Sequence, residues 1–189
     1  MAYNIKDVFY LSTSATIAAS TSNGGSAQLD LSAYIDPIAR RRSKGTGLAI
    51  YKCHFGITHD NSDPIDDAES GVFSYGLQAG AGFGDLATGQ LNTLAGAYDM
   101  TNALLIESGA FYGPKSQIGN ANTTMSMFPN TAVSPSKDVP YVVVRDNVCL
   151  TYNVMEQMVD ETVLSVRLEV AQVSLDQSTL NQLLRTQTV

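Results

Sequence analysis

The fold is decided by residues 141–175, YVVVRDNVCLTYNVMEQMVDETVLSVRLEVAQVSL. Apolar residues recur at every second position on both sides of a short polar segment, and this period of two is typical of strands that bury one face. We therefore predict a long hairpin whose second arm turns Ser165, Arg167 and Glu169 toward solvent. Beyond Ala171 the apolar residues move from even to odd positions, which indicates a bulge.

The same period predicts further strands along the chain. Eight strands are expected, at 8–19, 27–35, 48–58, 72–77, 103–112, 141–145, 148–155 and 162–175. The apolar run at 104–106 also fits the start of a buried helix. Asn23-Gly24 lies between the first two strands, and this dipeptide favours the type I′ turn of a same-sheet hairpin. Residues 113–139 form a long polar loop, and residues 176–187 form a short helix that Asp176 can cap.

The composition is low in charge. The 189 residues fit one β-sandwich domain, 1–189, and charged residues make up 15% of them, against a usual share of about 25%. Such a surface suits packing against other copies of the chain, and it equally suits a secreted β protein. A net charge of −7 argues against nucleic-acid binding. No apolar run approaches the ~20 residues of a membrane helix, and no signal peptide is recognisable.

The reactive residues do not form a catalytic pattern. Cys53 and His54 are adjacent on a predicted strand, so their side chains point to opposite faces. His59 lies five positions further on, an odd spacing that separates the two histidines across a sheet. No nucleophile elbow, phosphate loop or dinucleotide fingerprint is present, and we predict that the chain is not an enzyme. Cys53 and Cys149 are expected to be buried free thiols, with a disulfide as the alternative.

Two features are candidates for partner contact. The segment 40–44, Arg-Arg-Arg-Ser-Lys, holds four of the eleven basic residues. It fits lipid head groups or the acidic loop of a neighbouring copy better than DNA, and a solvated turn is the alternative. The predicted helix is too short to be stable alone and must dock on its own domain or on a neighbour. The predicted contact residues are therefore Arg40, Arg41, Arg42, Lys44, Leu180, Leu183 and Leu184.

An acidic loop follows the third predicted strand. Asp60, Asp63, Asp66 and Asp67 supply oxygen ligands at the density that a calcium ion takes, but the spacing of an EF-hand is missing. We favour a solvated loop, with a structural cation near these four residues as the alternative. No cofactor is predicted.

Eight antiparallel strands with long, uneven loops in a low-charge chain of this length resemble the single jelly roll of icosahedral virus coat proteins. The resemblance implies an all-β antiparallel sandwich with a short C-terminal helix, which self-assembles with its own copies and other coat proteins into a virion in the host cytoplasm. The chain departs from many RNA-virus coats because it has no basic amino-terminal arm. This departure favours a double-stranded DNA virus with an internal membrane. The hairpin expected at Asn23-Gly24 is a second departure, since consecutive jelly-roll strands mostly lie in opposite sheets.

A second reading is a carbohydrate- or receptor-binding β-sandwich module of a phage or a secreted protein. Sugar platforms display aromatic faces. The chain has no tryptophan, but its nine tyrosines could serve instead.

Overall fold

A computed structural model describes residues 8–36, 44–80, 102–115 and 135–187, and the strand backbones at 117–118, 121–122 and 126–129. The elements are β1 (Phe9–Ile17), β2 (Gly25–Asp30), β3 (Lys44–His59), β4 (Val72–Ala79), β5 (Leu105–Tyr112), β6 (Gln117–Ile118), β7 (Ala121–Asn122), β8 (Ser126–Pro129), β9 (Tyr141–Val143), β10 (Asn147–Glu156), β11 (Thr162–Asp176) and α1 (Gln177–Thr186). All eight predicted strands are confirmed. β6, β7 and β8 lie inside the segment that was predicted to be a loop.

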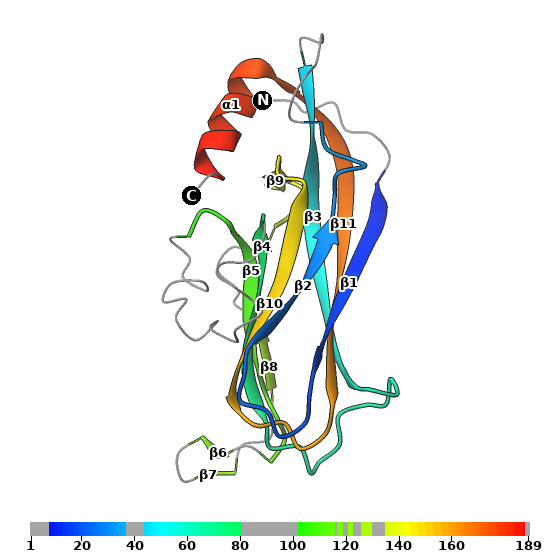
Figure 1. Ribbon diagram of the computed structural model, residues 1–189, viewed down its shortest axis with the longest axis vertical. Coiled ribbons are helices and arrows are strands. Elements are labelled where there is room, and N and C mark those ends of the chain that lie inside the picture. The colour runs from blue at the N-terminus through cyan, green and yellow to red at the C-terminus, as the bar shows by residue number, and fades with distance from the viewer. Residues whose placement is uncertain are drawn as a thin grey trace.

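The long strands form two antiparallel sheets that pack face to face (Figure 1). One sheet has the order β1-β11-β3-β9, and the other has the order β2-β10-β4-β5-β8. If the eight predicted strands are numbered along the chain, these orders read 1-8-3-6 and 2-7-4-5, with β8 added at the edge of the second sheet. This is the double-sheet arrangement of a jelly roll. The predicted all-β fold class is confirmed.

Both predicted hairpins are wrong. β1 and β2 lie in opposite sheets, and so do β10 and β11. β11 pairs instead with β1 and β3, while β10 pairs with β2 and β4. In the connection that contains Asn23 and Gly24, the left-handed residue is Ser20, with a φ of 56°. A type I′ turn needs two central residues with positive φ, and Asn23 and Gly24 do not have it. Pairing between distant strands therefore outweighs the local turn preference of Asn23-Gly24.

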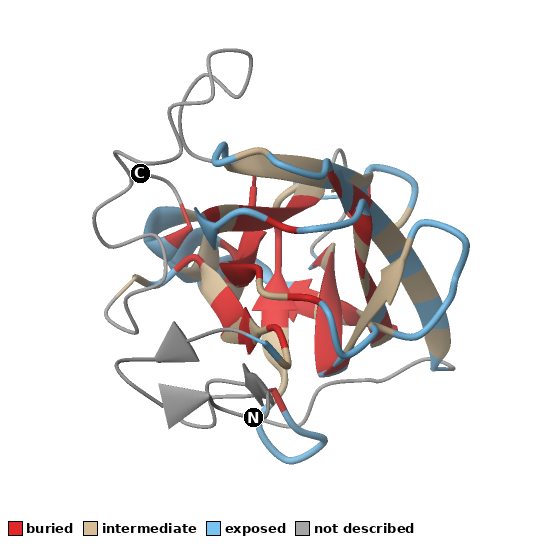
Figure 2. Ribbon diagram, turned by 90° about the horizontal axis from the view of Figure 1, so that it is seen from below, coloured by how far each residue is buried: buried red, intermediate tan, exposed pale blue. Residues whose placement is uncertain are grey.

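The space between the sheets holds the larger of two apolar clusters (Figure 2). Its largest fully buried side chains are Ile17, Leu31, Leu48, Ile50, Phe73, Tyr75, Leu77, Leu150, Met158, Leu164 and Leu168. Leu31 and Met158 come from connections, and the others come from strands of both sheets at alternating positions, as period-two patterning requires. Ser165, Arg167 and Glu169 lie on the opposite face of β11, as predicted.

The smaller apolar cluster explains the change of phase in β11. Ala171, Val173 and Leu175 are buried on the outer face of the sheet, where Leu180 of α1 covers them. The side chains of β11 therefore keep alternating between the two faces of the sheet. Beyond Ala171 the outer face of the strand is buried as well. The predicted bulge is misplaced: the register shift lies between Glu169 and Val170 on the β11 side, and the unpaired residue is Tyr51 of β3.

The other local predictions concern α1 and the two cysteines. Asp176 caps the helix, because its carboxylate accepts the backbone N–H of Thr179 at 2.7 Å. Cys53 and Cys149 are buried free thiols, as expected. Among the described residues no helix is long and apolar enough to cross a membrane.

Candidate functional site

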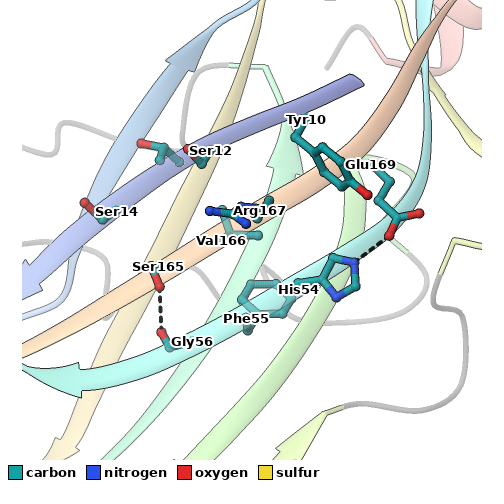
Figure 3. A pocket seen from close by; sticks show the side chains of 11 residues that line it. Tyr10, Ser12, Ser14, His54, Phe55, Gly56, Ser165, Val166, Arg167 and Glu169 are labelled. Carbon is teal, nitrogen blue, oxygen red and sulfur yellow. Dashed lines mark hydrogen bonds and ion pairs between the residues drawn. The ribbon is translucent and has the colours of Figure 1, made fainter. Parts of the chain in front are cut away.

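A groove of about 780 Å³ lies on the outer face of the β1-β11-β3-β9 sheet (Figure 3). Antiparallel register arranges its side chains in rows across β1, β11 and β3. One row is Ser12, Arg167 and His54, and the next begins with Tyr10 and Glu169. These five residues project away from the core because they hold the solvent-facing positions of their strands.

A hydrogen-bonded pair closes one side of the groove. His54 Nε2 lies 2.8 Å from Glu169 Oε1, and the two side chains are 42% and 30% exposed. Figure 3 shows the phenol ring of Tyr10 beside this pair. At 62% exposure, Tyr10 is an unusually open aromatic ring. A surface pair of this kind adds at most about 1 kcal/mol to the free energy of unfolding. The contact between His54 and Glu169 therefore contributes little to stability.

On the other side of the groove, Gly56 lines the surface with backbone alone because it has no side chain. The hydroxyl of Ser165 donates to the Gly56 carbonyl at 3.1 Å. A Cβ atom at Gly56 would lie 2.9 Å from Ser165 Oγ. Any larger residue at position 56 would therefore push into the groove or displace Ser165.

The groove offers an aromatic face, a guanidinium, a carboxylate and hydroxyls, which are the groups that recognise polar ligands such as sugars or peptides. Nucleophilic catalysis would need a base within reach of a nucleophile. Within the described part of the chain, no hydrogen bond joins a serine hydroxyl to His54; its recorded partner is Glu169. The groups that line the groove fit the binding of a polar ligand.

The sequence did not reveal this groove. Arg167 and Glu169 were predicted only to face solvent, and Tyr10 was not singled out. Their proximity depends on which strands flank β11, and single-strand periodicity carries no such information. The one usable signal was an aromatic residue at a solvent-facing strand position.

The predicted contact residues lie in two places. Arg40, Arg41 and Arg42 lie outside the described residues. Lys44 is exposed at the first position of β3, opposite Asp176 at the end of β11. Its positive charge contributes to the lowered pKa of Asp176, although the hydrogen bonds from Thr179 are the larger cause.

The leucine stripe of α1 docks on its own sheet. Leu180 has no exposed surface, so in this structure it cannot contact another copy. Leu183 and Leu184 are half-buried against the same cluster and keep some surface toward solvent. Of the two docking surfaces considered for the helix, its own domain is the one observed.

The acidic loop joins β3 to β4 and is exposed at all four predicted aspartates. Two of them bind backbone within the loop: Asp60 accepts the N–H of Asn61 at 2.7 Å, and Asp66 accepts the N–H of Ala68 at 2.9 Å. These local turns are typical of solvated loops.

Comparison with known proteins returns structures only. No family model and no curated protein matches the sequence. A solved structure that is similar is VP1 of the Trichodysplasia spinulosa-associated polyomavirus, in complex with GM1 oligosaccharide. The similarity covers 90% of this chain and 94% of that one, with a TM-score of 0.41 and 10% sequence identity.

Proposed function

We propose that this protein is a capsid subunit that self-assembles into the shell of an icosahedral virus. The observation that carries the proposal is the strand order, 1-8-3-6 against 2-7-4-5. Jelly rolls of this kind serve as viral capsid proteins, lectins and cupins. A cupin-type enzyme needs several convergent metal ligands, whereas the groove described above contains one histidine, bonded to Glu169.

The sheet edges support assembly on one side of the sandwich. β1 and β2 are the terminal strands of their sheets on that side, and they lie against each other. Two exposed apolar residues lie at this edge: Val8 at 54%, directly before β1, and Tyr10 at 62%, on β1. An open strand edge with exposed apolar residues is suited to contact with another chain. Because charged residues make up only 15% of the chain, a contact between two copies removes few charged groups from water.

The acidic net charge supports a shell that faces a membrane rather than a naked genome. A charge of −7 disfavours neutralisation of nucleic-acid phosphates. The proposed setting is therefore a virion of a double-stranded DNA virus with an internal membrane, assembled in the host cytoplasm with other coat proteins. Arg40, Arg41, Arg42 and Lys44 are the proposed contacts with lipid head groups or with an acidic neighbour.

The test is the size of the purified protein in analytical ultracentrifugation and negative-stain electron microscopy. We expect large closed particles or ring-shaped intermediates. A monodisperse monomer at high concentration would contradict the proposal. The triple change of Arg40, Arg41 and Arg42 to Ser is expected to lower particle yield or binding to vesicles that contain anionic lipids.

A matched control removes the same charge elsewhere. Lys52, Lys115 and Lys137 are exposed and lie outside the arginine segment. Their triple change to Ser alters net charge equally and is expected to leave assembly unchanged. Equal effects of the two triple variants would assign the loss to net charge and remove the arginine segment from the contact surface.

The groove favours a second function, recognition of a carbohydrate receptor. Tyr10 offers an exposed aromatic face for a sugar ring, while Arg167 and the His54–Glu169 pair offer hydrogen-bonding groups at its edge. Aromatic faces and bidentate guanidinium bonds are the usual means of binding sugars and their carboxylates.

A glycan array tests this second function. We expect binding that Tyr10→Ala and Arg167→Ala each reduce at least tenfold. Lys52→Ala is the control, because Lys52 lies opposite Glu169 on β3 but does not line the groove. An array without hits for the assembled protein would exclude the receptor function and leave the structural one standing.

A further inference from the structure

Two loops that are far apart in the sequence meet at the end of the sandwich opposite α1 (Figure 1). One joins β3 to β4, and the other joins β10 to β11. His59 is the last residue of β3, Asp66 belongs to the first loop, and Asp160 belongs to the second. One potential ligand atom from each of these three side chains lies within 4.8 Å of the other two.

His59 is half-buried as a residue, whereas both aspartates are exposed. Its hydrogen bonding is incomplete. Nε2 accepts one long hydrogen bond of 3.3 Å, from the backbone N–H of Asp66. Nδ1 is closed to solvent and has no hydrogen-bond partner. Buried polar atoms are nearly always paired, and an exception in a folded protein indicates an ion, a water molecule or a functional role.

Buried hydrogen bonds hold the two loops in place beneath this group. Glu69 has no exposed surface. Its carboxylate accepts the backbone N–H of Gly71 at 2.6 Å, that of Val159 at 3.1 Å and that of Asp160 at 3.4 Å. Glu69 belongs to the same loop as Asp66, whereas Val159 and Asp160 belong to the second loop. The hydrogen bonds of Glu69 therefore fix the backbone of Asp160 relative to the loop that carries Asp66. Metal sites depend on such outer hydrogen bonds to orient their ligands.

We propose that His59, Asp66 and Asp160 form a structural site for a divalent transition-metal ion of the zinc class. One imidazole and two carboxylates match zinc, which binds nitrogen and oxygen ligands at about 2.0–2.2 Å and completes its shell with water. Calcium takes six to eight oxygen ligands and has no use for the imidazole. Tetrahedral geometry at these bond lengths places ligand atoms about 3.4 Å apart, so the exposed aspartate side chains close inward on binding.

The role of the ion is to clamp the two loops. It would join β3 to the β10–β11 connection, and through them the two sheets, at the end of the sandwich opposite α1. The site differs from the structural cation that the sequence left as an alternative to a solvated acidic loop. Asp66 is common to both, but His59 and Asp160 replace the exposed Asp60, Asp63 and Asp67.

The experiment is thermal unfolding of the untagged, full-length protein after treatment with a chelator, with ZnCl₂, MnCl₂ or CaCl₂ added back. We expect the midpoint to rise with zinc concentration, because a ligand that binds only the folded state stabilises it by mass action. His59→Ala is expected to weaken zinc binding at least tenfold in calorimetric titration. Asp160→Asn is the second ligand variant, for use if His59→Ala does not fold.

Two control variants make the result specific. His54→Ala removes the other histidine, which is exposed on the outer sheet face. Asp63→Asn removes a carboxylate from the same loop, outside the group of three. Both are expected to bind zinc like the wild type. A zinc response that is equal in His59→Ala and the wild type, or a response to calcium alone, would overturn the proposal. Neither outcome bears on particle formation, which is measured separately.

Discussion

Gln187 acts as an extra hydrogen-bonding partner for Val144, just past the end of the edge strand β9. Its side-chain oxygen accepts the backbone N–H of Val144 at 3.1 Å, and its side-chain nitrogen donates to the carbonyl of Val142 at 2.7 Å. Arg145 reinforces the contact, since its Nε donates to the Gln187 carbonyl at 2.6 Å. The C-cap residue of α1 thus satisfies a sheet edge that would otherwise be open to another strand.

Gln187→Ala should destabilise the fold. Gln187 is 3% exposed, so its loss leaves the N–H of Val144 and the carbonyl of Val142 buried without their partner. We expect a loss of about 2 kcal/mol in the free energy of unfolding, measured by urea denaturation. The control is Gln177→Ala, because Gln177 is exposed and makes only a 3.4 Å contact with Asn181. An unchanged midpoint for Gln187→Ala would contradict this account of the edge.

Glu69→Ala should loosen the loop end of the sandwich. The change removes the acceptor of the backbone N–H groups of Gly71, Val159 and Asp160 in a place with no solvent access. We expect about 3 kcal/mol of destabilisation and faster amide hydrogen exchange in both connected loops. Glu161→Ala is the control, since Glu161 is exposed. Exchange that rises equally across the whole protein would indicate global rather than local loosening.

Native Cys53 should be inert toward thiol reagents. Burial raises the pKa of the Cys53 thiol well above its usual range, and the nearby Glu107 carboxylate raises it further. Because the thiolate is the reactive form, we expect modification by a disulfide reagent only at the rate of unfolding. Cys149, with no exposed surface, should behave alike. Rapid labelling of either residue under native conditions would show that the core opens locally.

The sequence predicted each strand but not its sheet. Period-two patterning reports which side chains of a strand are buried, and it placed Leu164, Val166 and Leu168 in the core correctly. It carries no information about which distant strand supplies the hydrogen bonds. The Asn23-Gly24 signal is also local, and it was overruled by the pairing of β1 with β11. The jelly roll was expected from the number of strands and the long loops, but the pairing of individual strands had to come from the structure because it is made of long-range contacts.

Burial on both sheet faces caused the second error. Val173 and Leu175 are apolar because α1 covers the outer face at that end of β11, and a pattern that assumes one buried face interprets them as a bulge. The candidate groove was missed for a related reason. Tyr10 and Glu169 are adjacent only through the β1–β11 register, so their shared surface exists in the folded sheet alone.

The cap of α1 predicts a pH dependence with a definite sign. The backbone N–H of Thr179 donates to Asp176, and this bond lowers the pKa of the Asp176 carboxyl from its model-compound value of 3.8. A group whose pKa is lower in the folded state stabilises the fold above its unfolded pKa. That contribution is lost as the pH falls through the folded pKa. The ionised cap therefore stabilises the fold at neutral pH and not in strong acid.

Asp176→Ala should therefore lower the urea midpoint near neutral pH and have a shrinking effect as the pH falls below about 3.8. Protonation weakens the bond from Thr179 in the wild type, so the two proteins converge in acid. Asp63→Ala, which removes an exposed loop carboxylate, controls for the loss of one negative charge and is expected to change the midpoint little at any pH. A gap between wild type and Asp176→Ala that is constant from neutral pH to about pH 2 would show that the ionised carboxylate does not stabilise the helix. Because Gln187 directly follows α1 as its C-cap, a weakened N-cap should also increase amide exchange at Val144.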